Sequence, residues 1–346
     1  MNSLTNEIQL PFGLMHQMWA VRGQSDASLL RQTAEDIVLA DELGYDSVWI
    51  AEHHYVRDGE FYSRLPDPEV FIASLIARTK RIRLATGIKL MVLDRAERIA
   101  EKLMLLHLLS DGRVIYGLGQ GGPEELGIRS LSVEEKRQQF RAGLEELAGY
   151  LRGTLVDGRL QLTPTVPLAP EQYLWAAVRD SESIAHASRE GANIIVGEAE
   201  IAIRQAPIIE QYRRAGGTGE ARGARLVCIA ETIEEAMADV REPAERLHAQ
   251  FSKLKYMQEA AALGLYDGDL DGANAEQILR NLEYAVGTPE KVTAELRDYI
   301  ETTGICALNI MVHAPGLSQT AAQRSLRMFM AEVAPSLLPA LEKNAP

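Results

Sequence analysis

Short apolar stretches alternate along the chain with longer segments in which apolar residues recur every three or four positions. The first pattern predicts strands buried on both faces, and the second predicts helices with one apolar face. The clearest example is residues 30–54. Apolar residues at helical spacing lead to Gly44, a typical left-handed helix stop, and residues 45–51 then have the composition of a buried strand.

This alternation occurs eight times, so the sequence predicts one domain over residues 1–346 with the fold of an eight-stranded α/β barrel, the (β/α)8 TIM barrel. The expected strands cover residues 9–16, 45–51, 82–89, 113–118, 173–178, 193–196, 225–230 and 307–312. Helices are expected at 67–80, 95–109, 133–152 and about 320–333, with an Asp-Gly hairpin within 155–162. Residues 250–282, after the seventh strand unit, break the rhythm and are a candidate insertion over the active site.

Glu52, His53 and His54 follow the second predicted strand at its carboxyl end, where α/β folds bind ligands. Neighbouring residues on a strand point in opposite directions, so His53 and His54 should not reach the same atom. His53 is the candidate acid-base residue, with Glu52 beside it, since an imidazole titrates near pH ~6.5. The alternative is a structural histidine satisfied by Glu52 or a backbone carbonyl. A metal site is disfavoured because three consecutive residues on a strand diverge.

Two other strand ends carry candidate binding residues. His16, Met18 and Trp19 follow the first strand and could line a substrate pocket, together with His54, although Trp19 could equally pack under a loop. Gly117, Gly119 and Gly122 fit a G-x-G-x-x-G pattern after the fourth strand. A helix does not open directly there, so a tight ligand-binding loop or a simple turn is preferred to a dinucleotide fingerprint.

Ser181 and Ser183 begin the helix that follows the fifth predicted strand. Hydroxyl groups beside the free N–H groups of a helix start suit a phosphate, and ordinary helix capping is the competing interpretation.

Charge and cysteine content disfavour several classes of partner and site. The formal net charge of −13 disfavours nucleic acids and anionic membranes as partners. With only two cysteines among 346 residues, the chain has no disulfide framework or thiolate metal site and suits the reducing cytoplasm. The first residues lack a signal-peptide pattern, and no apolar run is long enough to span a membrane.

The ordered set of motifs resembles the bacterial luciferase-like flavin monooxygenases over nearly the whole chain. The matching segments are Trp49-Ile50-Ala51-Glu52-His53-His54, Leu109-Ser110-Asp111-Gly112-Arg113, Asp180-Ser181-Glu182-Ser183, Val286-Gly287-Thr288-Pro289-Glu290 and Thr303-Gly304. The resemblance implies a barrel that binds reduced FMN, with the phosphate at the loops after strands four and five, His53 as the catalytic histidine, and a mobile lid at 250–282. The cofactor-binding candidates are Thr86, Gly119, Gln120, Gly121, Gly122, Arg137, Arg179, Asp180, Ser181 and Ser183.

Three residues depart from the luciferase pattern. Gln120 stands where the luciferase has a phosphate-binding arginine, so Arg137, Arg179 or backbone N–H groups would have to meet the phosphate charge. Gly119 replaces the reactive cysteine, and His107 replaces a common aspartate. The replacement of the cysteine by Gly119 argues against copying the substrate chemistry of the luciferase.

The resemblance implies a monooxygenase that uses reduced FMN and O2 to oxygenate a small organic molecule and forms a homodimer, as family members do. Because the chain lacks a nicotinamide fingerprint, we expect a two-component system in which a separate flavin reductase supplies the reduced FMN. Two alternatives stay open. The same barrel could use a deazaflavin for hydride transfer, or it could be a flavin-binding homologue without catalysis. The substrate and the type of oxygenation are not encoded in the motifs.

Overall fold

A computed structural model describes residues 10–55, 61–121, 131–197, 200–251 and 275–346. Eight parallel strands form a closed barrel, in which β8 pairs with β9 to complete the ring. The order around the barrel is β1, β3, β5, β6, β7, β8, β9 and β11. The strands are β1 (Phe12–His16), β3 (Ser47–Ile50), β5 (Arg83–Leu90), β6 (Val114–Gly119), β7 (Leu174–Ala177), β8 (Asn193–Ile195), β9 (Ala221–Ile229) and β11 (Ala307–Met311). The predicted TIM barrel is confirmed, and each of its strands falls at a predicted position.

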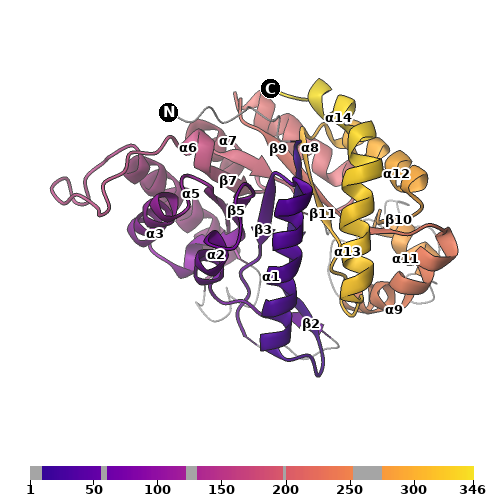
Figure 1. The fold of residues 1–346 in the computed structure, drawn as a ribbon. Helices are drawn as coiled ribbons and strands as arrows, with labels where there is room; N and C mark the ends of the chain where they lie inside the picture. Colours follow the sequence, from indigo (N-terminus) through magenta and orange to yellow (C-terminus); the bar gives the residue numbers. More distant parts are fainter. Residues whose placement is uncertain (1–9, 56–60, 122–130, 198–199, 252–274) are drawn as a thin grey trace, which may run out of the picture.

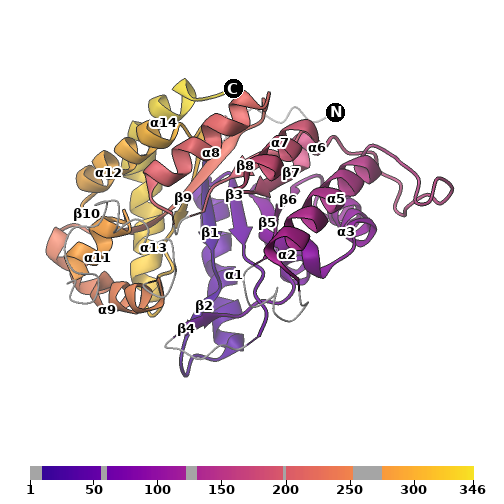
Figure 2. The same ribbon diagram turned by 180° about the vertical axis from the view of Figure 1, so that it is seen from behind.

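Helices surround the strands on the outside (Figures 1 and 2). The longer ones are α1 (Asp26–Leu43), α2 (Pro68–Ile76), α3 (Ala96–Leu109), α5 (Val133–Leu151), α7 (Ser181–Arg189), α8 (Ala202–Arg214), α9 (Ile233–Phe251), α12 (Pro289–Thr303), α13 (Gln319–Met328) and α14 (Ala334–Lys343). Gly44 ends α1 in the left-handed conformation, and Asp67 caps α2 through the N–H of Val70, as their positions in the sequence predict.

Several shorter elements were not predicted. They are β2 (Trp19–Val21), which pairs antiparallel with β4 (Phe61–Ser63), β10 (Ala285–Gly287), which extends the sheet beside β9, and α6 (Pro170–Tyr173) and α11 (Ala275–Asn281). Two single turns, η1 (Met91–Leu93) and η2 (Phe329–Val333), complete the set. The predicted final helix, at about 320–333, corresponds to α13 and the π turn η2, and α14 follows it without having been predicted.

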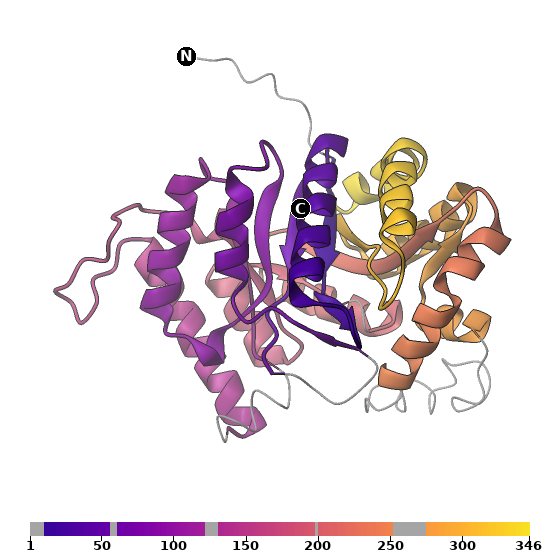
Figure 3. The same cartoon turned by 60° about the horizontal axis from the view of Figure 1, so that its bottom comes forward.

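Two predictions concern connections between elements. The Asp-Gly hairpin forms at Val156 and Leu160 and lies in the connection between α5 and α6 that extends away from the barrel (Figures 1 and 3). Of the candidate insertion at 250–282, residues 252–274 lie outside the described residues, and 275–281 form α11.

The amino-terminal end of the barrel interior is filled by a charged and aromatic group. Arg222 of β9 lies between Trp49 and Trp175, with its guanidinium carbon 5.7 and 5.5 Å from their rings. Asp46, just before β3, accepts hydrogen bonds from Arg222 at 2.6 and 3.2 Å. The barrel is thus closed at this end, which leaves its carboxyl end for a ligand.

Candidate functional site

The residues after β3 alternate as the strand geometry predicts. Glu52 is buried and accepts a hydrogen bond from the backbone N–H of Leu90 at 3.0 Å. The Nε2 atom of His54 lies 2.9 Å from Glu52, whereas Nε2 of His53 lies 3.2 Å from the side-chain oxygen of Gln17. The two histidines therefore have different partners, and His53 is the one that contacts the loop after β1.

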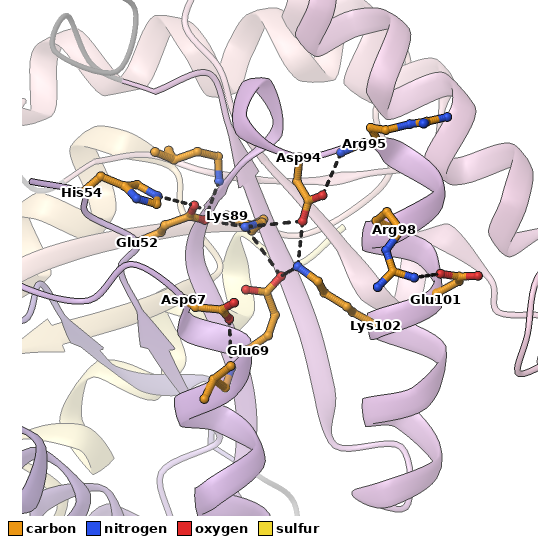
Figure 4. A network of polar contacts seen from close by, with 12 residues as sticks. Glu52, His54, Asp67, Glu69, Lys89, Asp94, Arg95, Arg98, Glu101 and Lys102 are labelled. Carbon is orange, nitrogen blue, oxygen red and sulfur yellow. Dashed lines mark hydrogen bonds and ion pairs between the residues drawn. The ribbon is translucent and has the colours of Figure 1, made fainter. Parts of the chain in front are cut away.

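A cluster of buried and partly buried charges surrounds Glu52 (Figure 4). The ammonium group of Lys89 lies 3.1 Å from Glu52 and 3.8 Å from both Glu69 and Asp94. Sequence analysis missed this cluster. The available signal was a lysine inside a strand that is otherwise buried, since a charged side chain in such a position requires a partner.

The loops after β6 and β7 meet through one side chain. The amide nitrogen of Gln120 donates to Ser183 at 3.2 Å and to Asp180 at 3.3 Å. Asp180 is the N-cap of α7, where it accepts the N–H of Ser183. Although burial raises the pKa of Asp180, the hydrogen bonds from Ser183 and Gln120 and the charge of Arg137 lower it overall. The structure thus brings Gln120, Asp180 and Ser183 together at the helix start.

Arginines lie around the same helix start. The Nε atom of Arg137 lies 3.5 Å from Asp180, and a terminal nitrogen of Arg141 lies 3.6 Å from the other oxygen of Asp180. Arg141, which sequence analysis missed, follows Arg137 at the four-residue spacing that places two side chains on one face of α5. Arg179 instead pairs with Glu200.

The remaining cofactor-binding candidates lie on or beside this edge of the barrel. Thr86 is buried and donates its hydroxyl to the carbonyl of Gly117 at 2.8 Å. A Cβ atom at Gly119 would lie 1.7 Å from the end of the Ile88 side chain, so the glycine allows β5 and β6 to approach closely. Gly121 has a φ of 79°, and Ser181 is exposed at the start of α7. Gly122 lies outside the described residues.

The substrate-binding candidates after β1 differ in their exposure. His16 is buried, with its Nδ1 atom accepting the N–H of Met18 at 3.0 Å, and burial holds its pKa well below the usual value. Met18 is fully buried in the layer between strands and helices. Trp19 is only partly buried and begins β2. Internal hydrogen bonds account for His16 and packing accounts for Met18, and contact with a substrate stays a prediction for all three.

A separate hollow of ≈ 520 Å³ lies outside the barrel, between α9, α11 and α12. None of the predicted site residues lines it. Within the described ranges, no three His, Cys, Asp or Glu side chains gather where they could hold a metal ion. No helix in this part of the chain is both long and apolar enough to cross a membrane.

Comparison with known proteins identifies the family to which the fold and the sequence motifs belong. The sequence profile of the luciferase-like monooxygenases matches residues 12–305, which include every barrel strand except β11. The chain belongs to this family. The resemblance seen in the sequence is therefore confirmed, as is the prediction that the chain is an oxidoreductase of the luciferase-like type.

Relatives and structural neighbours agree with this assignment. Limonene 1,2-monooxygenase of Rhodococcus erythropolis is 26% identical over 94% of this chain and 86% of its own length. N-acetyl-S-alkylcysteine monooxygenase of Bacillus subtilis is 30% identical, over 64% of this chain and 69% of its own.

Two solved structures share the fold. The oxygenating constituent of 3,6-diketocamphane monooxygenase from Pseudomonas putida, in complex with FMN, aligns with a TM-score of 0.77 at 19% identity, covering 95% of this chain and 99% of that one. An F420-dependent secondary alcohol dehydrogenase aligns at 0.69 and 16% identity, covering 95% and 99%.

Proposed function

We propose that the chain uses reduced FMN and O2 to oxygenate a small organic substrate. The observation that carries this proposal is the junction of Gln120 with Asp180 and Ser183, which joins the two loops predicted to hold the phosphate. This junction and the Glu52 to His54 segment all follow carboxyl ends of barrel strands, so cofactor and histidine would share one face.

The residues present fit an FMN phosphate. The start of α7 supplies backbone N–H groups and the Ser181 hydroxyl, and a helix N-terminus favours an anion. Asp180 adds a negative charge there, but Arg137 and Arg141 lie within 3.6 Å of it and offset that charge. The phosphate would compete with Asp180 for these guanidinium groups.

When bound, reduced FMN would supply the reaction of O2 with the substrate. The chain's part is to bind, orient and exchange protons. His53 would hold or transfer a proton through its imidazole, with Gln17 fixing the orientation of the ring at 3.2 Å. Glu52, which is buried and paired with Lys89, would act by holding His54 and the backbone of Leu90 in place.

The decisive experiment combines flavin binding and oxygen consumption. Titration with photoreduced FMN under anaerobic conditions should show binding, and admitting air with candidate substrates should give product together with flavin reoxidation. Absence of FMN affinity in both redox states would contradict the proposal.

The source of reduced flavin is part of the same proposal. We expect a separate reductase, since the glycines do not fit a nicotinamide fingerprint: Gly117 and Gly119 lie in β6, and the next helix among the described residues begins at Val133. Sustained turnover by the purified chain with NADH or NADPH and FMN alone would contradict this.

A deazaflavin hydride-transfer enzyme is the second candidate. Two observations favour it: the arginines near α7 already have acidic partners, and an F420-dependent dehydrogenase shares the fold. Such an enzyme would reduce or oxidise its substrate without consuming O2. Oxygen uptake that depends on reduced FMN separates the two candidates.

A homodimer and a cytoplasmic location complete the proposal. Val70 of α2 and Leu105, Leu108 and Leu109 of α3 are each at least half exposed, on two helices that pack together. Leu105, Leu108 and Leu109 have the spacing of one helix face, and exposed apolar side chains gathered on one face often mark an interface. Both cysteines, Cys228 and Cys306, are buried free thiols, which is compatible with a reducing compartment.

A further inference from the structure

The charges around Lys89 do not balance, and three of the groups, Glu52, Glu69 and Lys89, are buried, whereas Asp94 and Lys102 are partly exposed. Three carboxylates, of Glu52, Glu69 and Asp94, face two ammonium groups, of Lys89 and Lys102 (Figure 4). A buried excess charge is strongly unfavourable. One of the carboxylates is therefore expected to exchange a proton in the range where the protein is folded.

The contacts indicate which carboxylate does so. Asp94 accepts hydrogen bonds from Lys102 at 2.7 Å and from the N–H of Arg95 at 2.9 Å, and Glu52 is bonded to Lys89 and Leu90. Glu69 is 4% exposed, and neither of its buried carboxylate oxygens receives a hydrogen bond from the described part of the chain. Its nearest cations are Lys102 at 3.5 Å and Lys89 at 3.8 Å.

The surroundings of Glu69 hold both signs of charge. Lys89 of β5 and Lys102 of α3 favour the carboxylate, whereas Asp67 at the start of its own helix opposes it. Asp94 lies beside the same lysines, and the buried Tyr116 of β6 is close enough for Glu69 to affect its titration. Burial is the largest effect and raises the pKa of Glu69 to about 7.

We propose that Glu69 is a positioning residue for the stretch after β3, and that its protonation decides how firmly Lys89 is held by Glu52. The contacts run from Glu69 to Lys89 at 3.8 Å, from Lys89 to Glu52 at 3.1 Å, and from Glu52 to His54 at 2.9 Å. Protonated Glu69 leaves Lys89 to neutralise Glu52. Ionised Glu69 shares Lys89, so that less of the Glu52 charge is neutralised by Lys89 and Glu52 binds His54 more strongly.

The proton moves only between solvent and the Glu69 carboxyl group, and no bond other than O–H is made or broken. The consequence for catalysis rests on the proposed function, because His54 adjoins His53. The electrostatic coupling between Glu69, Lys89 and Glu52 does not rest on the proposed function. It can be measured on the whole chain without flavin, O2 or substrate, so its failure and that of the proposed function are distinguishable.

The test is the titration of His54 by NMR in the wild type and in Glu69→Gln, with the signal assigned from a His54→Gln variant. Gln keeps the shape of Glu69 but never ionises. We expect the His54 ring signals of the wild type to shift over the pH range in which Glu69 ionises, and Glu69→Gln to lack this step, because the variant carries no charge that draws Lys89 away from Glu52. His54 signals that change with pH in the same way in both proteins would overturn the proposal.

Glu101→Gln is the matched control, because Glu101 pairs with Arg98 on the outer side of α3 and should leave His54 unchanged. A second measurement does not depend on any variant folding. In the wild type, one glutamate carboxyl carbon should titrate near neutral pH instead of near pH ~4.3. A spectrum in which every carboxyl carbon titrates in the ordinary acidic range would equally refute the inference.

Discussion

The Nε2 atom of His54 lies 2.9 Å from Glu52, while its neighbour His53 contacts Gln17 instead. The two histidines therefore serve different parts of the structure.

His53→Ala should lower product formation by at least ~10²-fold, the usual scale for losing a positioned acid-base group, while hydrogen peroxide release continues. His53 lies beyond the strand end, so the variant should fold and bind reduced FMN nearly as the wild type does. Product and peroxide yields are the measurements.

His54→Ala is the control for this prediction. Glu52 would keep Lys89 and the N–H of Leu90, so the backbone should stay in place and the loss of product should be smaller. Equal losses in both variants, or unfolding of His53→Ala, would show that the pair is structural.

Arg137 provides a test of the phosphate site. Arg137→Ala removes one of the two guanidinium groups near Asp180, and the affinity for reduced FMN should fall by roughly tenfold, equivalent to one charge-assisted contact. Arg152→Ala removes an arginine paired with Glu190 at the far end of α5 and should leave the affinity unchanged. Anaerobic flavin titration compares the two, and an equal effect would argue against the assigned position.

Asp46 and Arg222 provide a stability test at the opposite end of the barrel. Asp46→Asn leaves the buried guanidinium of Arg222 without its carboxylate, which should cost roughly 3–5 kcal/mol of unfolding free energy. Glu210→Gln, which removes an exposed pair with Arg214, should cost under about 1 kcal/mol. Urea unfolding measures both, and similar costs would refute the buried-pair argument.

The pH dependence of this pair follows from the same contacts. Burial raises the pKa of Asp46, but the charges of Arg222 and Arg83 and the hydrogen bonds of Arg222 and Ser47 lower it overall. The stabilisation is therefore present above the unfolded-state value near ~3.8 and is lost as the pH falls through the folded-state pKa.

Glu69 should have the opposite pH dependence. Its pKa rises from 4.5 to about 7 on folding, so below ~4.5 both states are protonated and no penalty exists. As pH rises toward 7, the unfolded chain loses this proton first, and folding becomes less favourable by up to about 3 kcal/mol. Glu69→Gln should therefore be more stable than the wild type at pH 8 and equal to it at pH 4. Equal stability at both pH values would contradict this.

The exposed leucines of α3 test the proposed homodimer. Leu105→Glu places a charge among the exposed leucines of α3 and should convert the protein to monomers at micromolar concentration. Leu160→Glu changes an equally exposed leucine on the hairpin and should leave the dimer intact. Light scattering measures the masses, and a monomeric mass for the wild type would contradict the proposed homodimer.

Local patterns in the sequence were enough to establish the barrel. Alternating strand and helix patterns predicted the eight strands. A glycine at position 44 predicted a helix end, and Asp67 followed by Pro68 predicted a helix start; both are found in the structure. The motifs at strand ends also gave the family. These features depend on residues close together in the chain, so spacing and residue type reveal them.

Contacts between distant residues required the tertiary structure. The hydrogen bonds from Gln120 to Asp180 and Ser183 join loops 60 and more positions apart, and no local pattern indicates them. Glu52, Glu69 and Lys89 come from different elements, and their burial together sets the titration of Glu69. The sequence alone therefore determined the barrel and the family, and it indicated the strand ends at which the chemistry is predicted. Only the folded chain decided which charges are buried side by side, because desolvation and Coulomb energies depend on distance in space.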